Sequence, residues 1–187
     1  MNIVKSLFFE IKNLFAKIII LWPDTNFGNR LRIWYYKKRL KKLGIGAKIE
    51  SGVLFGDPNS IEIGINCLFG RNVNVNAGPC NGIFIGNDIA LAEGTYVRSA
   101  NHKFSNLDLP ILNQGHYSKA IQYNNRTYSI VIEDNVWVGA HSIILSGAHI
   151  STGTIIGAGS RIDSYIPPNS IVIGNPAVIV GTREHRV

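Results

Sequence analysis

The N-terminal part of the chain carries a helical pattern of hydrophobic positions. Between residues 3 and 22, apolar side chains recur at spacings of three and four: Val4, Leu7, Phe8, Ile11, Leu14, Phe15, Ile18 and Leu21 or Trp22. This spacing predicts an amphipathic helix that Pro23 would end. A second helix is predicted over residues 29–43, with Gly44 as its C-terminal stop.

From residue 45 onward the hydrophobic period becomes six. It runs without a slip through Ile132, Val138, Ile144, Ile150, Ile156 and Ile162, and the residues four positions later are Val136, Ser142, Ala148, Thr154, Ser160 and Ile166. Upstream it connects Ile49, Phe55, Ile61, Cys67, Val73 and Pro79, with Ile63, Phe69 and Val75 on the companion position. The register slips by four around 79–84 and resumes at Ile85, Leu91 and Val97. Residues 103–127 carry no repeat and form an insertion.

A period of six predicts a coil of short strands and tight turns, in which each hexapeptide forms one side. Three hexapeptides make one coil of about 18 residues, and stacked coils with parallel strands cover each other's core. The aliphatic residue points inward, and a small residue four positions later leaves room at the corner. We therefore predict an all-β, parallel β-helix over residues 45–187, preceded by a helical segment over residues 1–44.

Charge is distributed unevenly along the 187 residues, whose formal net charge is +7. Residues 1–50 hold eleven Lys and Arg against three acids, whereas the rest holds eight against nine. The longest apolar run near the N-terminus, residues 18–23, is far shorter than the ~20 residues of a membrane span. Two cysteines are too few for a disulfide scaffold. We expect a cytoplasmic protein.

The second predicted helix is strongly basic and contains Trp34, Tyr35 and Tyr36. Three interpretations are open: it packs on the end of the coil, it contacts an anionic membrane surface together with the first helix, or it binds nucleic acid. Nucleic acid is not among the partners we expect. Peripheral membrane contact through residues 1–43 would suit an enzyme that modifies a lipid-linked glycan.

Two segments resemble a known family. The run VIEDNVWVGAHSIILSGAHISTGTIIGAGSRI and the later IPPNSIVIGNPAVIV are similar to the hexapeptide-repeat acyltransferases, in particular the maltose, galactoside and surface-polysaccharide O-acetyltransferases. The resemblance covers roughly residues 45–180. It implies a left-handed parallel β-helix, a homotrimer, and acetyl-CoA as acyl donor in the cleft between neighbouring subunits.

The resemblance also assigns the acceptor side of a site. His102 lies 17 residues after Ile85, where the family has the histidine that acts as general base. Asn76 matches the asparagine that orients the acceptor, although the register slip leaves Asn74 as a competitor. Asn101 would join them. Each of these side chains could instead be an ordinary loop or corner residue.

For the donor, the resemblance implies that the backbone amides of Ala140 and Ala158 hold the pantetheine arm and that Trp137 lines the cleft. The basic residues that members carry near the C-terminus for the CoA phosphates are replaced, which leaves Arg183, Arg161 and Arg186 as substitutes. In the insertion, Tyr117, Tyr123 and Arg126 could contact a sugar or could simply be solvated.

The resemblance implies transfer of acetyl from acetyl-CoA to a sugar hydroxyl, in the synthesis of capsule, exopolysaccharide or lipopolysaccharide. The alternatives are N-acetylation of an amino-sugar nucleotide and a non-catalytic trimeric scaffold. We expect no metal, because the histidines lack the spacing of a zinc site. A covalent mechanism through Cys80 and His102 is not favoured either, and Cys67 is expected in the core.

Overall fold

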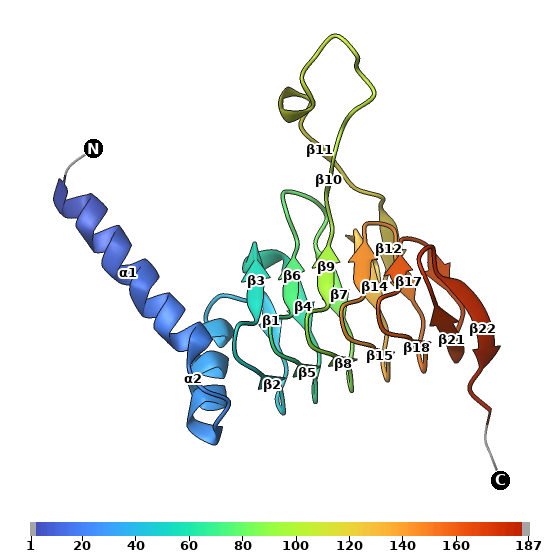
Figure 1. The fold of residues 1–187 in the computed structure, drawn as a ribbon, viewed down its shortest axis with the longest axis horizontal. Coiled ribbons are helices and arrows are strands. Elements are labelled where there is room, and N and C mark those ends of the chain that lie inside the picture. The colour runs from blue at the N-terminus through green and yellow to red at the C-terminus, as the bar shows by residue number, and fades with distance from the viewer. Residues whose placement is uncertain (1–2, 185–187) are drawn as a thin grey trace.

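The computed structural model describes residues 3–184 and begins with two helices, α1 (Ile3–Leu21) and α2 (Asn26–Lys37). Helix α2 covers one end of a long prism of short strands, and α1 projects away from that end (Figure 1). Thr25 caps α2, because its hydroxyl accepts a hydrogen bond of 3.1 Å from the backbone N–H of Gly28. Arg32 and Tyr36 are the large buried side chains of α2. The interpretation in which this helix packs on the end of the coil is thus confirmed.

The predicted bounds of the second helix are wrong at both ends. It begins at Asn26 rather than at 29, and it ends at Lys37 rather than at 43. Beyond its end, Leu40 enters the hydrophobic core and the N–H of Lys41 donates to the carbonyl of Pro58 at 3.0 Å. Because this segment already bonds to the first coil, residues before Gly44 form a strand instead of a last helical turn.

Three parallel sheets form the prism, and we call them faces A, B and C. Face A contains, in order, β1 (Lys42–Leu43), β4 (Ile61–Ile63), β7 (Ile83–Ile85), β14 (Ile130–Ile132), β17 (His149–Ile150) and β20 (Tyr165–Ile166). Face B contains β2 (Lys48–Ile49), β5 (Leu68–Phe69), β8 (Ala90–Leu91), β15 (Trp137–Val138), β18 (Ile155–Ile156), β21 (Ser170–Ile173) and the antiparallel β22 (Val178–Thr182). Face C contains β3 (Leu54–Gly56), β6 (Asn74–Asn76), β9 (Tyr96–Arg98), β16 (Ile143–Leu145) and β19 (Arg161–Ile162).

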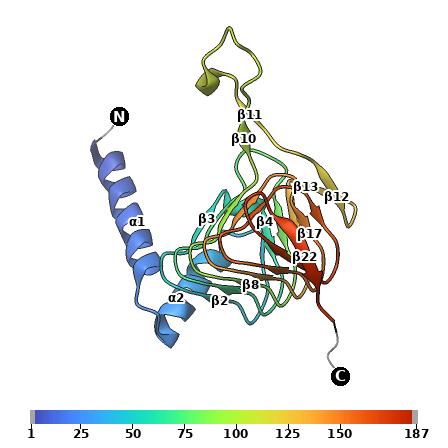
Figure 2. The same ribbon diagram turned by 45° about the vertical axis from the view of Figure 1, so that its right-hand side comes forward.

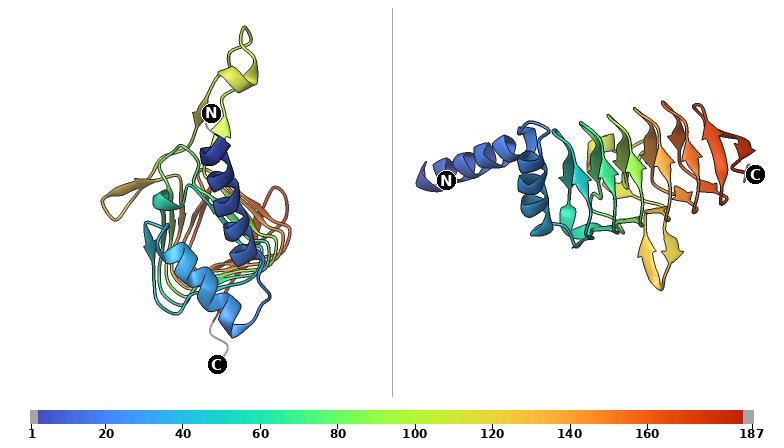
Figure 3. Two further views of the ribbon diagram at one scale, coloured as in Figure 1. Left: turned by 90° about the vertical axis from the view of Figure 1, so that its left-hand side faces the viewer. Right: turned by 90° about the horizontal axis from the view of Figure 1, so that it is seen from below.

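The core is a set of parallel columns of apolar side chains inside the prism. The left view of Figure 3 shows the ribbon of the prism from its end. In face B the column is fully buried and in register: Ile49, Phe69, Leu91, Val138, Ile156 and Val172. Each side chain covers the one below it, so no coil buries its aliphatic residues alone. The predicted left-handed parallel β-helix with an N-terminal helical segment is confirmed.

All variation in coil length falls at one edge of the prism. From face A to face B, and from face B to face C, matching inward residues are always six apart. From face C to face A the spacing varies, as the pairs Phe55 to Ile63, Val75 to Ile85, Val97 to Ile132, Ile144 to Ile150 and Ile162 to Ile166 show. We call this corner the C–A edge; it comprises residues 57–60, 77–82, 99–129, 146–148 and 163–164.

Two details of the predicted register change as a result. Ile63 rather than Ile61 pairs with Leu43, because the first C–A corner holds two extra residues in the short 3₁₀ helix η1 (Pro58–Ser60). Cys67 and Val73 therefore occupy corners, where both are buried. Ile166, expected at a corner, pairs with Ile150 in face A, because the last C–A corner is two residues short. The predicted slip around 79–84 is confirmed by the pairing of Ile63 with Ile85.

The insertion leaves the prism at the C–A edge and contains more regular structure than its sequence indicates. Its base is an antiparallel pair of strands, β10 (Asn101–His102) and β11 (His116–Tyr117), and η2 (Ile111–Asn113) lies between them in the chain. It returns through a hairpin, β12 (Ile121–Tyr123) and β13 (Arg126–Tyr128), beside face A (Figure 2).

Candidate functional site

His102 lies at the base of the insertion, where the C–A edge is widest. It is exposed, and the antiparallel register of β10 and β11 sets it opposite His116. The centroids of the two imidazole rings are 4.4 Å apart and their planes are tilted by 39°. The neighbouring pair in the same ladder is Asn101 with Tyr117. The adjacent predicted site residues Asn101 and His102 thus both lie in the short strand β10, opposite β11.

Asn74 and Asn76 alternate with the buried Val75 in β6, so both point outward from face C. The C–A corner that follows Asn76 contacts the start of the insertion: the N–H of Ser99 donates to the carbonyl of Asn76 at 3.1 Å, and the Ser99 hydroxyl donates to the carbonyl of Ala77. The structure therefore brings Asn76 and the segment leading to His102 together at one edge. The side-chain oxygen of Asn76 accepts from the N–H of Gly78 at 2.9 Å, which fixes the direction of its amide.

The predicted donor residues lie at the other border of face C, the B–C edge. Ala140 follows β15 and Ala158 follows β18, and within residues 3–184 the N–H of neither donates a hydrogen bond. Their two corners stack so closely that a Cβ atom on Gly139 would lie 2.5 Å from the backbone nitrogen of Ala158. Two free, stacked N–H groups could bind the amide carbonyls of an extended chain.

Trp137 and Arg183 are brought together on the outside of face B. Trp137 is 53% exposed and lies between Ala90 and Ile155 in the sheet. Both residues line a cavity of about 290 Å³, whose other lining residues are Asp88, Ala90, Asn135, Val136 and Ile155. The Arg183 guanidinium donates to the carbonyl of Gly153 at 2.9 Å.

Two other basic residues, Arg161 and Arg186, were predicted from the sequence as partners of the CoA phosphates. Arg161 is engaged with the side chains of Asn175 and Asp163. Arg186 lies outside the described residues.

Tyr123 is not brought near His102. Its ring packs over face A, with centroids 5.1 Å from Phe84 and 5.6 Å from His149. Burial, followed by the charges of Glu133 and Asp134, raises the pKa of Tyr123. A role for Tyr123 in binding substrate stays a prediction.

The hairpin that carries Tyr123 is held by the nearly buried Glu62. The carboxylate of Glu62 accepts from Lys41 at 2.9 Å, from Arg126 at 2.9 Å and from the Tyr128 hydroxyl at 3.0 Å. Burial alone would raise the pKa of Glu62, but the hydrogen bonds from Lys41 and Tyr128 and the nearby positive charges lower it overall. Arg126, which sequence analysis offered as a sugar contact, is thus tied to a carboxylate.

A polar cavity along the C–A edge contains residues that the sequence did not single out. It has a volume of about 550 Å³ and is lined by Lys41, Asn59, Ser60, Asn81, Asn125, Arg126, Thr127 and Tyr128. Apart from Lys41, which precedes β1, they come from three successive C–A corners, which only the coil stacking brings together, and Arg126 among them was named in the sequence analysis. The Asn81 side chain also donates to Ser118 of the insertion at 3.4 Å. At the base of the insertion, Tyr117, Lys103, Phe104 and Ser105 line a second cavity of about 330 Å³.

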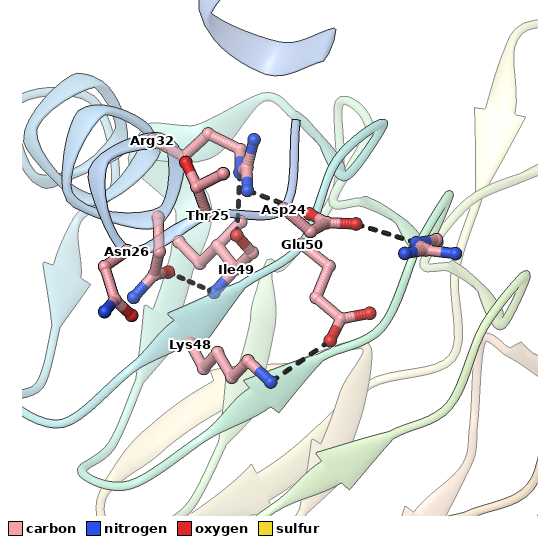
Figure 4. Close-up of a pocket in the computed structure, with 9 residues that line it drawn as sticks. Asp24, Thr25, Asn26, Arg32, Lys48, Ile49 and Glu50 are labelled. Carbon is pink, nitrogen blue, oxygen red and sulfur yellow. Dashed lines mark hydrogen bonds and ion pairs between the residues drawn. The ribbon is translucent and has the colours of Figure 1, made fainter. Parts of the chain in front are cut away.

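A further cavity, of about 410 Å³, lies beside α2 at the N-terminal end of the prism (Figure 4). Its centre is an ion-pair network in which Asp24 accepts from Arg32 at 3.0 Å and from Arg71 at 2.7 Å. Arg32 is 1% exposed and also donates to the backbone carbonyls of Ile49 and Trp22. These bonds attach the helices to the first coils. The charged residues at this cavity are therefore explained by their role in stabilising the fold.

Cys67 is buried, as expected, and its S–H donates to the carbonyl of Gly86 at 3.2 Å. Burial, with a small contribution from nearby carboxylates, raises the pKa of Cys67 to about 11. A thiol with so high a pKa is a poor nucleophile at neutral pH. Cys67 is therefore a packing residue of the hydrophobic core.

Known proteins resemble this chain in sequence. Residues 129–164 match the family described as bacterial transferase hexapeptide (six repeats). A galactoside O-acetyltransferase of Lactococcus lactis is 32% identical over 63% of this chain and 61% of its own length. A putative lipopolysaccharide biosynthesis O-acetyl transferase of Escherichia coli is 27% identical over 82% and 84%. The chain spans less than two thirds of the length of the Lactococcus enzyme.

Solved structures resemble it in fold. A galactoside acetyltransferase in complex with coenzyme A superposes with a TM-score of 0.71, at 23% identity, over 88% of this chain and 75% of that one. A hexapeptide-repeat acetyltransferase of Vibrio cholerae gives 0.69, also at 23%, over 97% and 93%. At this identity the likeness concerns the fold. This chain therefore carries the hexapeptide repeat of these transferases over residues 129–164, and its stacked coils share their fold.

Proposed function

We propose that this protein transfers an acetyl group from acetyl-CoA to a hydroxyl of a sugar acceptor. The observation that carries the proposal is the placement of His102: it is exposed at the base of the insertion, beside Asn101 and on the same edge as Asn76. Relatives named as galactoside O-acetyltransferase and putative lipopolysaccharide O-acetyl transferase support the acceptor class. The second name supports a role in surface-polysaccharide synthesis, that is, of capsule, exopolysaccharide or lipopolysaccharide.

His102 is assigned as the general base. A sugar hydroxyl is a poor nucleophile until a base accepts its proton, and a neutral imidazole can do so near pH 7. The hydroxyl oxygen attacks the thioester carbonyl as the imidazole takes its proton, which gives a tetrahedral oxyanion. Collapse of this intermediate breaks the carbon–sulfur bond, and the proton passes from the imidazolium to the departing thiolate of CoA. No acyl-enzyme is formed. Asn76 or Asn74, with Asn101, orients the acceptor.

The donor is assigned to the B–C edge. The free N–H groups of Ala140 and Ala158 would bind the carbonyls of the pantetheine arm, much as a strand edge binds an added strand. Trp137 of β15, three residues before Ala140, offers an exposed aromatic wall on face B. Arg183, at the same cavity as Trp137, would pair with a phosphate of CoA.

The proposed site needs two subunits. In one chain, the acceptor residues lie at the C–A edge and the donor residues at the B–C edge, on opposite borders of face C. A homotrimer of parallel prisms would set the C–A edge of one subunit beside the B–C edge of the next, and closed symmetry would repeat this site three times. Light scattering should give a trimer at micromolar concentration, and an active monomer would refute this arrangement.

Mixed trimers provide a sharper test of the shared site. A His102→Ala chain lacks the base, and a Gly139→Ala chain has a displaced donor corner. At acetyl-CoA concentrations well below KM, where the Gly139→Ala corner limits the rate, co-refolding the two should raise activity at interfaces that combine the intact His102 of one subunit with the intact Gly139 corner of another. A mixture no more active than the two variants measured separately would place the site within one chain.

The experiment that tests the function is acetyl-CoA consumption measured against a panel of sugars, with mass spectrometry of the product. His102→Ala should lower turnover by about 10²–10⁴ and leave the affinity for CoA nearly unchanged, because backbone amides hold the arm. His149→Gln, which changes a histidine of face A, should retain activity. A product acetylated at nitrogen on an amino-sugar nucleotide would favour the N-acetyltransferase alternative. No acetyl transfer with any acceptor would favour the trimeric scaffold.

We also place the reaction in the cytoplasm at the inner face of the membrane, with residues 1–43 in contact with it. Within the described residues, the structure contains no helix that is both long and apolar enough to cross a membrane. Any such contact would therefore be peripheral.

A further inference from the structure

Helix α1 leaves a wide stripe of large apolar side chains uncovered. The helix projects from the end of the prism (Figure 1, Figure 3). Eight of its apolar side chains are between 48% and 69% exposed: Leu7, Phe8, Phe9, Ile11, Leu14, Phe15, Ile18 and Leu21. Near the C-terminal end of the helix, Ile19 is buried and Ile20 is partly buried against the core. Burial of the helix is thus confined to its last turn.

All of the uncovered residues except Phe9 form one face. With 100° between successive residues, Leu7, Ile11, Leu14 and Ile18 project in almost the same direction, with Phe8, Phe15 and Leu21 beside them. Ile20 projects to the opposite side of the helix, and the buried Ile19 lies at the border of the stripe, next to Phe15. The apolar stripe therefore points away from the protein's own core, and no described part of this chain covers it.

Positive charge accompanies the stripe. Lys5, Lys12 and Lys17 of α1 are exposed and face only one acid on the same helix, Glu10. Residues 1–50 together carry eleven basic residues and three acids. An amphipathic helix with an aromatic and aliphatic face and lysines on its flanks is typical of helices that lie in a membrane interface.

We propose that α1 lies flat in the surface of an anionic lipid bilayer, with the stripe of Leu7 to Leu21 inserted among the acyl chains and the lysines in contact with lipid phosphates. The positive charge of the segment favours an anionic bilayer, rather than a second copy of the chain, as the partner that covers the stripe. Two copies would bring two strongly basic segments together, whereas an anionic bilayer attracts them. The proposal does not depend on acetyl transfer, because it rests on a part of the chain remote from the candidate site.

The test compares adjacent residues of opposite faces in the full-length protein. Leu14→Glu adds a charge to the stripe, and Asn13→Glu adds the same charge to the polar side. Sedimentation with large unilamellar vesicles of 70% phosphatidylcholine and 30% phosphatidylglycerol should show binding of the parent. Binding should fall more than tenfold for Leu14→Glu but only about fivefold for Asn13→Glu, which perturbs the electrostatic attraction alone. Raising NaCl from 0.05 to 0.5 M should weaken binding of the parent.

Three outcomes would each overturn the proposal. The first is a parent protein that does not bind these vesicles, and the second is two variants that bind equally well. The third is a Leu14→Glu protein that forms a smaller oligomer than the parent in light scattering without lipid, which would make the stripe an interface between copies. Thermal melting of each variant verifies that the prism is intact, which is expected because residues 13 and 14 are exposed.

A second, independent observation concerns the stacked pair at the base of the insertion. His116 belongs to the returning strand β11, and its ring lies against the ring of His102. His102 is exposed and the ring of His116 is stacked against it, so His116 would restrict the rotation of the His102 imidazole. The geometry points to His116 as a positioning residue for His102. This inference rests on the proposed function.

Substitution by another ring separates this role from a mere contribution to stability. His116→Ala should lower kcat about tenfold with little change in KM for acetyl-CoA, because a general base held in one orientation is in place for more of the time. His116→Phe keeps a flat ring that cannot accept a proton and should recover most of the lost kcat. His149→Gln is the matched control.

The outcomes distinguish this inference from the proposed function. If His102→Ala retains its activity, the proposed base is wrong. If His102→Ala is inactive while His116→Ala matches the parent, only the positioning role is wrong. If His116→Phe is as slow as His116→Ala, ring stacking is not what matters, and the positioning role is overturned as well.

Discussion

Gly139 offers a direct test of how the β-helix holds its acyl donor. The residue follows β15 at the B–C edge, where a Cβ atom would lie 2.5 Å from the backbone nitrogen of Ala158 and 2.9 Å from its Cα. Ordinary van der Waals contact begins at 3.4 Å, so in Gly139→Ala the two stacked corners must separate by about 0.9 Å. Backbone atoms block the new methyl group, and no side-chain rotation can make room for it.

The expected effects follow from that displacement. Overpacking of a rigid site costs about 1–3 kcal/mol. For a chain of this size, 1 kcal/mol lowers Tm by roughly 2–4 °C, so Gly139→Ala should melt about 2–12 °C below the parent. The amides of Ala140 and Ala158 move with the corners. Each hydrogen bond lost to the pantetheine arm should raise KM for acetyl-CoA about two- to twelvefold, while saturating donor restores most of kcat.

Thermal melting and thiol release at varied acetyl-CoA concentration measure the two effects. Gly181→Ala is the matched control, because no heavy atom lies within 4 Å of a Cβ at that position. A Gly139→Ala protein that melts and binds acetyl-CoA like the parent would refute the steric reasoning. A lower Tm with an unchanged KM would instead show that the amides at this edge do not hold the donor.

Two further predictions concern the stability of the prism. Arg32→Ala should destabilise the protein by about 3–5 kcal/mol in urea unfolding, because it leaves Asp24 and two backbone carbonyls without their buried donor, whereas Arg30→Ala on the exposed side of α2 should cost less than about 0.5 kcal/mol; equal losses would contradict this. The lowered pKa of Glu62 means that its ion pairs stabilise the fold above an unfolded pKa of about 4.3 and are lost as pH falls through the lower folded value. Glu62→Gln should therefore be less stable than the parent at pH 7, and the difference should shrink below about pH 4; a constant difference across that range would be inconsistent with the ion pairs.

The sequence by itself determined the architecture of the prism. The hexapeptide period is a local property: each aliphatic residue needs only its place on a short strand and a small residue at the next corner. Two sides of every coil keep the period without exception, from face A to face B and on to face C. For that reason Ile132, Val138 and Ile144 could be assigned to the core from spacing alone, and all three are fully buried.

The third corner could not be predicted in the same way. Loops at the C–A edge add only small residues such as Ala77 and Ala148 to the core cluster, so their lengths are free to vary and the hydrophobic period carries no information about them. The pairing of Ile63 with Leu43 became visible only once the coils were stacked, because Ile61 is just as apolar and just as buried. The same holds for Ile166, which spacing placed at a corner.

Resemblance to a family directed attention to His102, but only the tertiary structure decided its surroundings. His116 is 14 residues away in a segment without any repeat, and the antiparallel ladder of β10 and β11 brings the two rings together. Tyr123 was predicted from the same segment as a contact for substrate, and only the structure shows that its ring packs on Phe84. Contacts of this kind depend on where an irregular loop returns to the prism, which short-range spacing does not encode.

The N-terminal segment shows both contributions within a few turns of helix. Its hydrophobic spacing determined that α1 would be amphipathic, and its charge determined that the segment would be basic. Only the fold decided that Arg32 would be buried among backbone carbonyls while the stripe around Leu14 stayed exposed. The physical reason is that a helical period specifies which residues share a face, whereas the neighbours of that face are set by the rest of the folded chain.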